Sequence, residues 1–434
     1  MTKVITYGTY DLMHYGHVRL LERAKALGDY LIVGVTAEDF DKQRGKINVK
    51  QSLEERIANV RATGLADQII VEEYEGQKID DIKRYDVDIF TVGSDWVGVF
   101  DYLNEYCKVV YLDRTQGISS TQLRQENSVN IGIVGASRVV NKFGNECGYV
   151  NGIEVAGVCT DNTKVLSEEL QGAELTGDFT QLLTKVDAVY IYSTPELHYD
   201  QAKQALLAGK HVLCESPIAL KKEQCIELFQ IAKEKGLVLQ ESIKTAYSLA
   251  YSRLVLLAKG GKIGKIVSVD TSCTSLKDLP EGWGSLDDWG PTAMLPVLQL
   301  LGTDYRSIEV LSQFNEETGF DSFTKVNFRY DHSVASVKVA NGVKSEGELI
   351  VSGTKGYIYV PAPWWKTDYF EVRFENPDNN KRYFYQLDGE GIRFAIVSFI
   401  KAIEGIQSTG YIEESVSEAI SGVIEYSKEN AIVL

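Results

Sequence analysis

Several features that would place a chain in a specialised class are missing from this sequence of 434 residues. Its six cysteines form no C-x-x-C pair, so neither a zinc site nor a disulfide framework is indicated. No apolar run approaches the ~20 residues that span a bilayer. The first residues, MTKVITYG, lack the charged and then apolar layout of a signal peptide and predict a strand instead. We expect a cytoplasmic protein without a membrane span or a metal site.

Positive charge is also scarce. The chain has 45 lysines and arginines against 61 aspartates and glutamates, which gives a formal net charge of −16. Nucleic acids and anionic membrane surfaces attract basic proteins, so this charge argues against a general nucleic-acid or membrane binder. Any polyanion that the chain binds is expected to sit in a local pocket.

The order of apolar segments predicts an α/β fold. From residue 1 to 126, short apolar runs alternate with segments of helical spacing, such as Val18–Leu27. After a polar stretch the alternation restarts at Ile131–Val134, so both regions predict parallel sheets covered by helices. From about residue 246, alternating runs such as Lys265–Ser275 predict mainly antiparallel strands. We expect domains at 1–126, 130–245 and 246–434, the last of them α+β.

Two histidines stand three residues apart where the first strand gives way to the first helix. The segment reads GTYDLMHYGH and contains His14 and His17. The start of a helix has free N–H groups and a partial positive charge, so it favours an anion, and Gly16 would let a phosphate approach closely. Two imidazoles there could stabilise a phosphate that gains charge in a transition state. The alternative is one capping histidine and one packed histidine.

A second segment, RTQGISST, begins at Arg114 after the predicted strand Val109–Leu112. It supplies a guanidinium, hydroxyl groups and a glycine turn before another helical segment. Alone it is typical of an ordinary capped turn. Because the carboxyl ends of parallel strands meet at one edge of a sheet, we expect it to lie near the histidine loop. Together the two segments predict a triphosphate site.

The quoted segments, with LLERAKALGDYLIVGV between them, resemble the cytidylyltransferases of the H-x-G-H nucleotidyltransferase superfamily over residues 1–126. The motif R-T-x-G-I-S favours this family over H-x-G-H adenylyltransferases, and the spelling GTYDLMHYGH favours the bacterial glycerol-phosphate type. The resemblance implies a Rossmann-like nucleotidyltransferase domain. It also implies transfer of CMP from CTP, with Mg²⁺, to glycerol 3-phosphate or another small polyol or amino-alcohol phosphate. The products would be CDP-glycerol and pyrophosphate, for a surface polymer such as teichoic acid or capsule.

The resemblance also assigns residues. Catalytic roles are implied for His14, His17, Lys46 and Arg114. Nucleotide-binding roles are implied for Thr9, Tyr10, Asp11, Gly16, Arg44, Asp95, Thr115, Ser119 and Ser120. The stretch that holds Arg44 and Lys46 has an alternative interpretation as a solvated run of charges.

From Asn130 onwards the chain resembles the Gfo/Idh/MocA oxidoreductases through IGIVGASRVV, YIYSTPELHYDQAKQALLAGKHVLCESPIAL and IKTAYSLAYSRLVLLAKGGKIGKIVSVD. This family pairs an NAD(P)-binding Rossmann domain with a C-terminal sheet domain, and its open sheet implies a homo-oligomer. Possible contacts to NAD(P) are Gly135, Ser137 and Asp161. Ser137 replaces the second glycine of the G-x-G-x-x-G fingerprint.

Two further departures concern the chemistry of that family. Ser216 stands where the family has the lysine of E-K-P, and Thr292 replaces the histidine of D-x-G-x-H. Without these groups the usual proton transfer is lost, so we expect a redox-inactive module. Two alternatives stay open. One is an active NAD(P)-dependent reductase that makes the polyol phosphate with substitute groups, and the other is a nucleotide- or sugar-binding assembly module without turnover.

Overall fold

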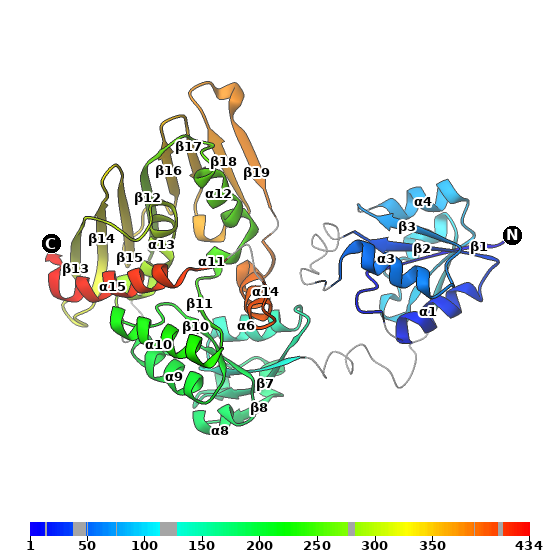
Figure 1. The fold of residues 1–434 in the computed structure, drawn as a ribbon, viewed down its shortest axis with the longest axis horizontal. Helices are drawn as coiled ribbons and strands as arrows, with labels where there is room; N and C mark the ends of the chain where they lie inside the picture. Colours follow the sequence, from blue (N-terminus) through cyan, green and yellow to red (C-terminus); the bar gives the residue numbers. More distant parts are fainter. Residues whose placement is uncertain are drawn as a thin grey trace. The chain divides into compact units, whose positions relative to one another are not determined.

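The computed structural model describes residues 1–13, 15–37, 49, 51–74, 76–112, 128–276, 283–385, 387–406 and 411–434. The chain folds into two compact units, the first holding strands β1–β5 and the second holding β6–β20 (Figure 1). Each unit is described by itself. The expected division of the second unit at residue 245 stays a prediction.

The first unit is a five-stranded parallel sheet with the order β3-β2-β1-β4-β5. Its apolar strands form because short buried runs at Val4, Leu31 and Phe90 leave no polar face along the strand. The strands are β1 (Lys3–Gly8), β2 (Tyr30–Thr36), β3 (Gln68–Glu72), β4 (Ile89–Gly93) and β5 (Lys108–Leu112). The helices are α1 (Tyr15–Lys25), α3 (Leu53–Ala62), α4 (Gln77–Tyr85), η1 (Ser94–Trp96) and η2 (Asp101–Glu105).

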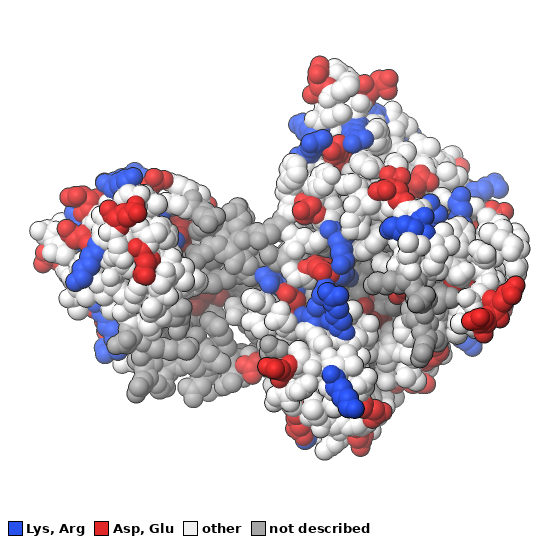
Figure 2. Space-filling model, turned by 180° about the vertical axis from the view of Figure 1, so that it is seen from behind, with Lys and Arg blue, Asp and Glu red and all other residues white. Residues whose placement is uncertain are grey.

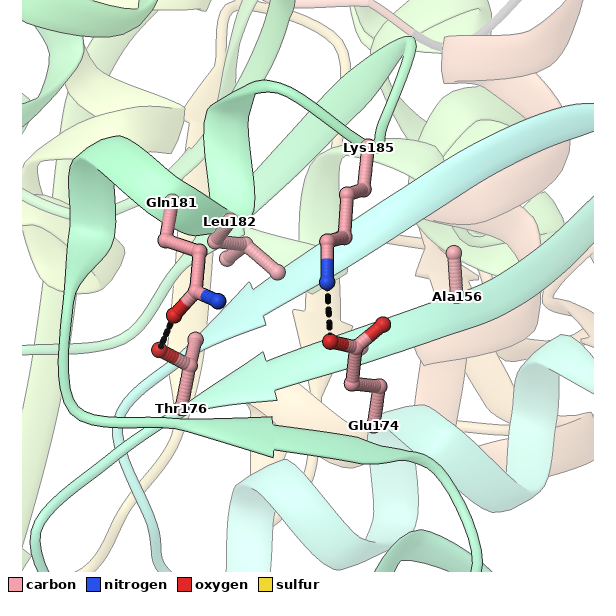
Figure 3. Close-up of a pocket in the computed structure, with 7 residues that line it drawn as sticks. Ala156, Glu174, Thr176, Gln181, Leu182 and Lys185 are labelled. Carbon is pink, nitrogen blue, oxygen red and sulfur yellow. Dashed lines mark hydrogen bonds and ion pairs between the residues drawn. The ribbon is translucent and has the colours of Figure 1, made fainter.

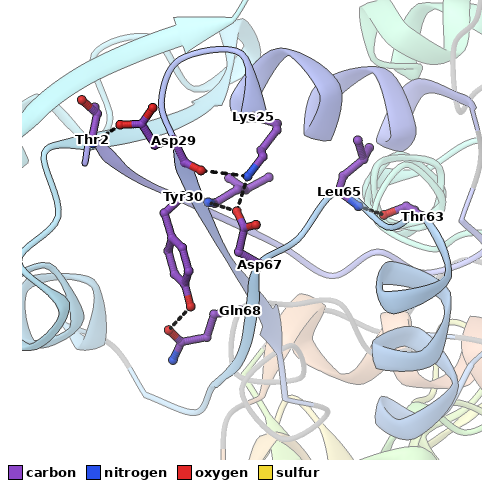
Figure 4. Close-up of polar contacts among 9 residues, drawn as sticks. Thr2, Lys25, Asp29, Tyr30, Thr63, Leu65, Asp67 and Gln68 are labelled. Atoms are coloured by element: carbon purple, nitrogen blue, oxygen red, sulfur yellow. Dashed lines mark hydrogen bonds and ion pairs between the residues drawn. The ribbon is translucent and has the colours of Figure 1, made fainter.

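Polar contacts fasten helix α1 to the amino ends of the strands (Figure 4). Lys25, in the last turn of α1, forms an ion pair with Asp67 and donates to the carbonyl oxygen of Asp29 at 3.1 Å. Asp67 also accepts from the backbone N–H of Leu31 at 2.6 Å, and the Lys25 ammonium lowers the pKa of its carboxyl group. These contacts fix the end of α1 that lies opposite His17, so the start of the helix is held at the other edge of the sheet.

The second unit begins with a six-stranded parallel sheet of order β11-β10-β9-β6-β7-β8. Its strands are β6 (Val129–Val134), β7 (Ile153–Cys159), β8 (Glu174–Thr176), β9 (Ala188–Ile191), β10 (His211–Glu215) and β11 (Leu239–Ser242). The helices are α6 (Arg138–Cys147), η3 (Thr163–Val165), α7 (Glu168–Gln171), α8 (Phe179–Leu183), α9 (Pro195–Leu207), α10 (Lys222–Lys235), α11 (Lys244–Tyr247) and α12 (Leu249–Lys259).

A nine-stranded mixed sheet follows, with the order β19-β18-β17-β16-β12-β15-β14-β13-β20. Its strands are β12 (Ile266–Ser275), β13 (Ser307–Phe314), β14 (Asp321–Arg329), β15 (Val334–Asn341), β16 (Leu349–Gly353), β17 (Tyr357–Val360), β18 (Tyr369–Arg373), β19 (Lys381–Phe384) and β20 (Ile432–Val433). The helices are α13 (Ser285–Leu301), η4 (Trp364–Lys366), η5 (Pro377–Asn379), η6 (Asp388–Gly391), α14 (Ile392–Ile403) and α15 (Glu414–Asn430).

The fold class predicted from the sequence is confirmed: two parallel α/β sheets precede a mainly antiparallel one. One detail differs, because β12 pairs in parallel with β15 and β13 pairs in parallel with β20. Helix α13 packs against β12 and β15 on one face of the nine-stranded sheet (Figure 1). In the part of the chain that the structure describes, no helix has both the length and the apolar character needed to cross a membrane.

The first turn of α13 generates a prediction. Asp287 is 7% exposed, and burial raises the pKa of its carboxyl group to about 6 although Lys428 lies 3.8 Å away. The folded state therefore binds more protons than the unfolded state between about pH 4 and 6, and stability falls as the pH rises through that range. We expect Asp287→Asn to raise the free energy of unfolding at pH 7.5 by roughly 1–3 kcal/mol and to have little effect at pH 4.

Thermal unfolding of the full chain between pH 4 and 7.5 measures this difference. The matched control is Asp304→Asn, since Asp304 is exposed. Parallel pH profiles for wild type and Asp287→Asn would contradict the assignment.

Candidate functional site

The loop after β1 lies at the topological switch point of the first sheet. Strand β1 pairs with β2 on one side and β4 on the other, and all three run in the same direction. β1 ends at Gly8 and β4 ends at Gly93, which is paired with Leu112 at the end of β5. Strands β1, β4 and β5 therefore end at one edge of the sheet. Open α/β sheets bind ligands in the crevice outside the carboxyl ends of their strands.

The backbone of this loop is unusual for residues other than glycine. Tyr10 and Leu12 have φ values of 53° and 48°, in the left-handed region. The Tyr10 ring is buried against the end of β1, where a Cβ at Gly8 would approach it to 3.0 Å. Left-handed residues at such a turn persist only where the surroundings fix them, and they are common at functional sites.

Tyr10 also orients the imidazole of His17. The ring centroids of the two residues lie 5.6 Å apart in a T-shaped arrangement with an interplanar angle of 67°. Tyr10 is 2% exposed, and its burial raises the pKa of its hydroxyl group. The structure thus gives Tyr10 a packing role beneath His17, and direct contact between Tyr10 and a nucleotide stays a prediction.

Helix α3 holds the loop from the side through residues that the sequence analysis did not single out. Arg56 is fully buried and donates to the carbonyl oxygens of Thr9 at 2.8 Å and Thr36 at 2.8 Å, and also to that of Gln51 at 3.2 Å. The carbonyls of Thr9 and Thr36 follow β1 and end β2, so one guanidinium joins two neighbouring strand ends. A buried cation that serves three carbonyl oxygens makes this edge rigid.

Gln51 adds a second tie between α3 and the loop. Its backbone N–H donates to the Asp11 carboxylate at 3.0 Å, and its side-chain oxygen accepts from the Leu12 N–H at 2.8 Å. The next residue, Ser52, starts α3 with a capping box completed by Glu55. The S-x-x-E signal is readable in the sequence, and Arg56 and Val60 are both buried one turn apart on that helix. The capping box therefore marks the start of α3, but no local pattern singles out Arg56.

A buried polar network lies beneath the neighbouring strand ends. Glu72, at the end of β3, forms an ion pair with Lys78 and accepts from the Thr36 hydroxyl at 3.0 Å. The Lys78 ammonium lies 4.7 Å from the centre of the Tyr7 ring, and the Tyr7 hydroxyl donates to Asp81 at 2.9 Å. Through these contacts, helix α4 links the carboxyl ends of β1, β2 and β3. They also fix the position of Thr36, the last residue of β2.

The structure places only some of the predicted site residues. Thr9, Tyr10, Asp11, Gly16 and His17 come together on the β1–α1 loop and the start of α1. The backbone of Asp95 lies in η1, which follows β4 at the same edge. The other residues predicted for the first unit lie outside the described part of the chain: His14, Arg44, Lys46, Arg114, Thr115, Ser119 and Ser120.

The second unit has a corresponding switch point between β6 and β9. Gly135 follows β6 with a φ of 105°, and a Cβ there would lie 1.8 Å from the carbonyl oxygen of Tyr192, which follows β9. Ser137 begins α6, and its hydroxyl oxygen accepts from the N–H groups of Val139 and Val140 at 3.1 and 3.2 Å. Packing against Tyr192 therefore explains the glycine, and Ser137 already satisfies donors that a dinucleotide pyrophosphate would use. Asp161 is exposed beyond the end of β7.

The positions of the two departures from the Gfo/Idh/MocA pattern are also defined. Ser216, after β10, donates its hydroxyl to the buried carboxylate of Glu241. Burial raises the pKa of Glu241, and it also raises the pKa of Glu215, which accepts from the Tyr190 hydroxyl at 2.6 Å. Thr292 lies within α13. Neither Ser216 nor Thr292 can serve as an acid or base near neutral pH.

The hollow drawn in Figure 3 is not part of either edge. It lies against the middle of β7, β8 and the last turn of α8, and the contacts Lys185–Glu174 and Thr176–Gln181 line it. In the described residues, no group of three or more His, Cys, Asp or Glu side chains is arranged to hold a metal ion.

Comparisons with known proteins match the two units separately. The cytidylyltransferase-like family profile matches residues 5–126, and the profile of the oxidoreductase family with the NAD-binding Rossmann fold (Gfo/Idh/MocA) matches 129–242. Glycerol-3-phosphate cytidylyltransferase from Bacillus spizizenii is 52% identical over 126 residues, which are 29% of this chain and 97% of that protein.

The second unit has more distant relatives. A dTDP-3,4-didehydro-2,6-dideoxy-α-D-glucose 3-reductase from Actinomadura kijaniata is 34% identical over 124 residues, which are 28% of this chain and 37% of that protein. The solved structure of a 3-ketoreductase from Actinomadura kijaniata, in complex with TDP-benzene and NADP, superposes with a TM-score of 0.63 at 19% identity. That likeness covers 71% of this chain and 99% of the other, and it is one of fold.

Arg56 generates a prediction for this edge. Arg56→Met keeps an apolar stem but leaves the carbonyl oxygens of Thr9, Thr36 and Gln51 without their guanidinium donor. We expect the free energy of unfolding to fall by roughly 3 kcal/mol, because each buried acceptor left unpaired costs about 1–3 kcal/mol. We also expect weaker binding of a nucleoside triphosphate. Thermal unfolding and titration calorimetry measure the two effects.

Arg61→Met is the matched control, since Arg61 lies on the same helix and is exposed. Unchanged stability and triphosphate binding in Arg56→Met, equal to the control, would refute this role.

Proposed function

Because the chain belongs through its first 126 residues to the cytidylyltransferase-like family, we propose that it transfers CMP from CTP to glycerol 3-phosphate and releases CDP-glycerol and pyrophosphate. The observation that carries this proposal is the 52% identity that spans almost the whole length of a glycerol-3-phosphate cytidylyltransferase. The rigid β1–α1 loop at the switch point supports it, since a nucleotide site is expected there.

In the proposed reaction, a phosphate oxygen of glycerol 3-phosphate attacks the α-phosphorus of Mg·CTP. The bond from the α-phosphorus to the bridging oxygen breaks, and its electron pair leaves with pyrophosphate. The imidazoles of His14 and His17 would donate hydrogen bonds to the α-phosphoryl oxygens as charge builds on them. The chain itself forms no covalent bond, so positioning and charge stabilisation supply the rate enhancement.

The other predicted residues have roles around this centre. Thr9, Asp11, Gly16 and Asp95 would line the nucleotide pocket. Arg44, Lys46, Arg114, Thr115, Ser119 and Ser120 would bind the triphosphate or the nucleotide. Arg56 and Gln51 hold the loop that carries Thr9 and Asp11, so they act by positioning.

The setting of the reaction is also part of the proposal. CDP-glycerol would supply a surface polymer such as teichoic acid or capsule, and the reaction would take place in the cytoplasm. The half-buried strands of the nine-stranded sheet, such as β14 and β15, suit packing against a second copy of the chain. We propose a homo-oligomer on that ground.

We infer that the second unit is redox-inactive. Ser137 satisfies the N–H groups at the start of α6 with its own hydroxyl, and Ser216 and Thr292 replace the lysine and histidine that would handle protons. The residues at this edge do not fit NAD(P) in the usual way. The alternative function, an NAD(P)-dependent reductase that makes the polyol phosphate, draws its support from the NADP-bound structure of similar fold.

His17 gives the sharpest test of the transferase proposal. We expect His17→Asn to lower kcat for CTP-dependent pyrophosphate release by at least ~100-fold, because one aimed donor to the transition state is lost. Thermal unfolding should shift by no more than a few degrees. The matched control is His332→Asn, a histidine in the exposed turn before β15.

The acceptor is identified in the same assay by comparing glycerol 3-phosphate with ribitol phosphate, phosphocholine and phosphoethanolamine. Turnover of His17→Asn at the wild-type rate, or a preference for ATP over CTP, would refute the proposal.

The second unit is tested by titration with NADPH and NADH. We expect no quenching or shift of nicotinamide fluorescence up to about 0.1 mM, which is far above the range of a tight dinucleotide site. Binding together with oxidation of NADPH by a ketose phosphate would establish the reductase alternative instead. Ser137→Gly serves as the companion variant, because it frees the donors of Val139 and Val140.

A further inference from the structure

Three lysines from distant parts of the second unit converge on one carboxylate. The ammonium groups of Lys142, Lys366 and Lys244 lie 2.6, 2.8 and 3.4 Å from the carboxylate oxygens of Glu390. Lys142 is on α6, Lys244 begins α11, Lys366 ends η4, and Glu390 is in η6 before α14. We call these four residues the Glu390 cluster.

The backbone holds Glu390 in place. Its φ is 52°, and the glycines on either side also have positive φ values of 57° and 90°. A Cβ at Gly389 would lie 2.2 Å from a carboxylate oxygen of Glu146, so the turn packs closely on α6. A glutamate held in the left-handed region between two such glycines indicates a fixed position, which is common where function constrains a turn.

The charges of the cluster do not balance. Three ammonium groups face one carboxylate, whose pKa the lysines hold down at about 2, chiefly through the hydrogen bond from Lys142. The nearby Glu146 is paired with Arg393 at 2.8 Å. The four residues of the cluster by themselves carry a formal charge of +2, in a chain whose net charge is −16.

The lysines remain accessible to a ligand. Their side chains are 29–40% exposed. Figure 2 shows that lysines and arginines are interspersed with acidic side chains on the face of the second unit that is in view. Each ammonium has three N–H donors, so contact with Glu390 leaves donors for another acceptor. Burial lowers the pKa of Lys244, and repulsion from the Lys366 ammonium group lowers it further.

The cluster also lies at the edge where ligands bind in this fold. Lys244 comes two residues after the carboxyl end of β11, and its charge acts on Glu215 at the carboxyl end of the adjacent β10. Lys142 belongs to the helix that follows β6. Open α/β sheets bind ligands outside the carboxyl ends of their strands.

We propose that the Glu390 cluster binds the phosphate group of a small phosphate monoester, with glycerol 3-phosphate as the probe. A phosphate monoester carries about −1.5 to −2 charges at pH 7, which matches the excess charge of the cluster. Glu390 spaces the three ammonium groups, and the phosphate oxygens accept from their remaining N–H donors. The cluster shares no residue with the nucleotide site of the first unit and needs no dinucleotide.

Protection of lysines from acetylation locates the site directly in the full wild-type chain. Mass spectrometry after brief acetylation reports each lysine separately. We expect glycerol 3-phosphate, but not glycerol, to slow acetylation of Lys142, Lys244 and Lys366 several-fold. Lys203 is the internal control, since it pairs with one carboxylate, that of Glu227 at 2.6 Å, and its side chain is 33% exposed.

Variants give the second measurement. We expect Lys244→Met to raise the glycerol 3-phosphate concentration that half-protects Lys142 and Lys366 by roughly tenfold, because one charge-assisted hydrogen bond is lost. Lys203→Met should leave it unchanged. Thermal unfolding checks that both variants are folded.

Three outcomes would overturn the proposal. They are equal protection of Lys203, no protection at concentrations that saturate cytidylyl transfer, and protection by NADPH but not by a phosphate monoester. Pyrophosphate release is read in the same samples. Failure of the cluster therefore appears as turnover without protection, and failure of the proposed transferase appears as protection without turnover.

Discussion

Strands that run in one direction end at one edge of a sheet, and both parallel sheets of this chain depend on that constraint. In each unit the first strand is flanked on both sides, by β2 and β4 in one and by β7 and β9 in the other. The loop after β1 diverges from the loop after β4, and the loop after β6 diverges from the loop after β9. Their backbone N–H and C=O groups therefore need hydrogen-bond partners from other segments. The groups that supply these hydrogen bonds determine which ligands the edge of the sheet can bind.

The two units meet this need in different ways. In the first, Arg56 of α3 bonds the carbonyl oxygens of Thr9 and Thr36, so a neighbouring helix holds the loop in its left-handed turn. In the second, Ser137 bonds the start of its own helix, and Gly135 closes against the Tyr192 carbonyl. A loop whose carbonyl oxygens are bonded by a neighbouring helix keeps its other polar groups for a ligand. A helix start that is capped by its own serine has fewer N–H donors left for one. The same fold therefore supports different chemistry at the two edges.

Local patterns were enough to predict most of the fold. The apolar runs at β1, β2 and β4 read as buried strands because both faces of a parallel sheet are covered. Helix α13 was not predicted, because Pro291 and Pro296 lie inside it and its propensity is poor. Burial between the nine-stranded sheet and α15 overrides that propensity. The parallel pairing of β12 with β15 could not be read either, since a half-buried strand alternates in the same way in both orientations.

The residues of the candidate site also differ in whether the sequence alone could reveal them. The glycines and histidines of the β1–α1 loop could be found because their motif is contiguous. Arg56 could not, since the carbonyl oxygens of Thr36 and Thr9 that it serves are 20 and 47 residues away in the sequence. The Glu390 cluster left no local signal, because Lys142 and Glu390 are 248 residues apart.

Stability alone does not account for three lysines on one carboxylate. A single exposed ion pair contributes about 0–1 kcal/mol, and each further lysine shares the same two oxygens while repelling its neighbours. Acidic residues are plentiful in this chain, with 61 of them, yet Glu390 is the one carboxylate to which the described ion pairs bring three lysines. The excess charge therefore belongs to its location, beside the carboxyl ends of β10 and β11. Ammonium groups that outnumber the carboxylate they surround keep N–H donors for a bound anion.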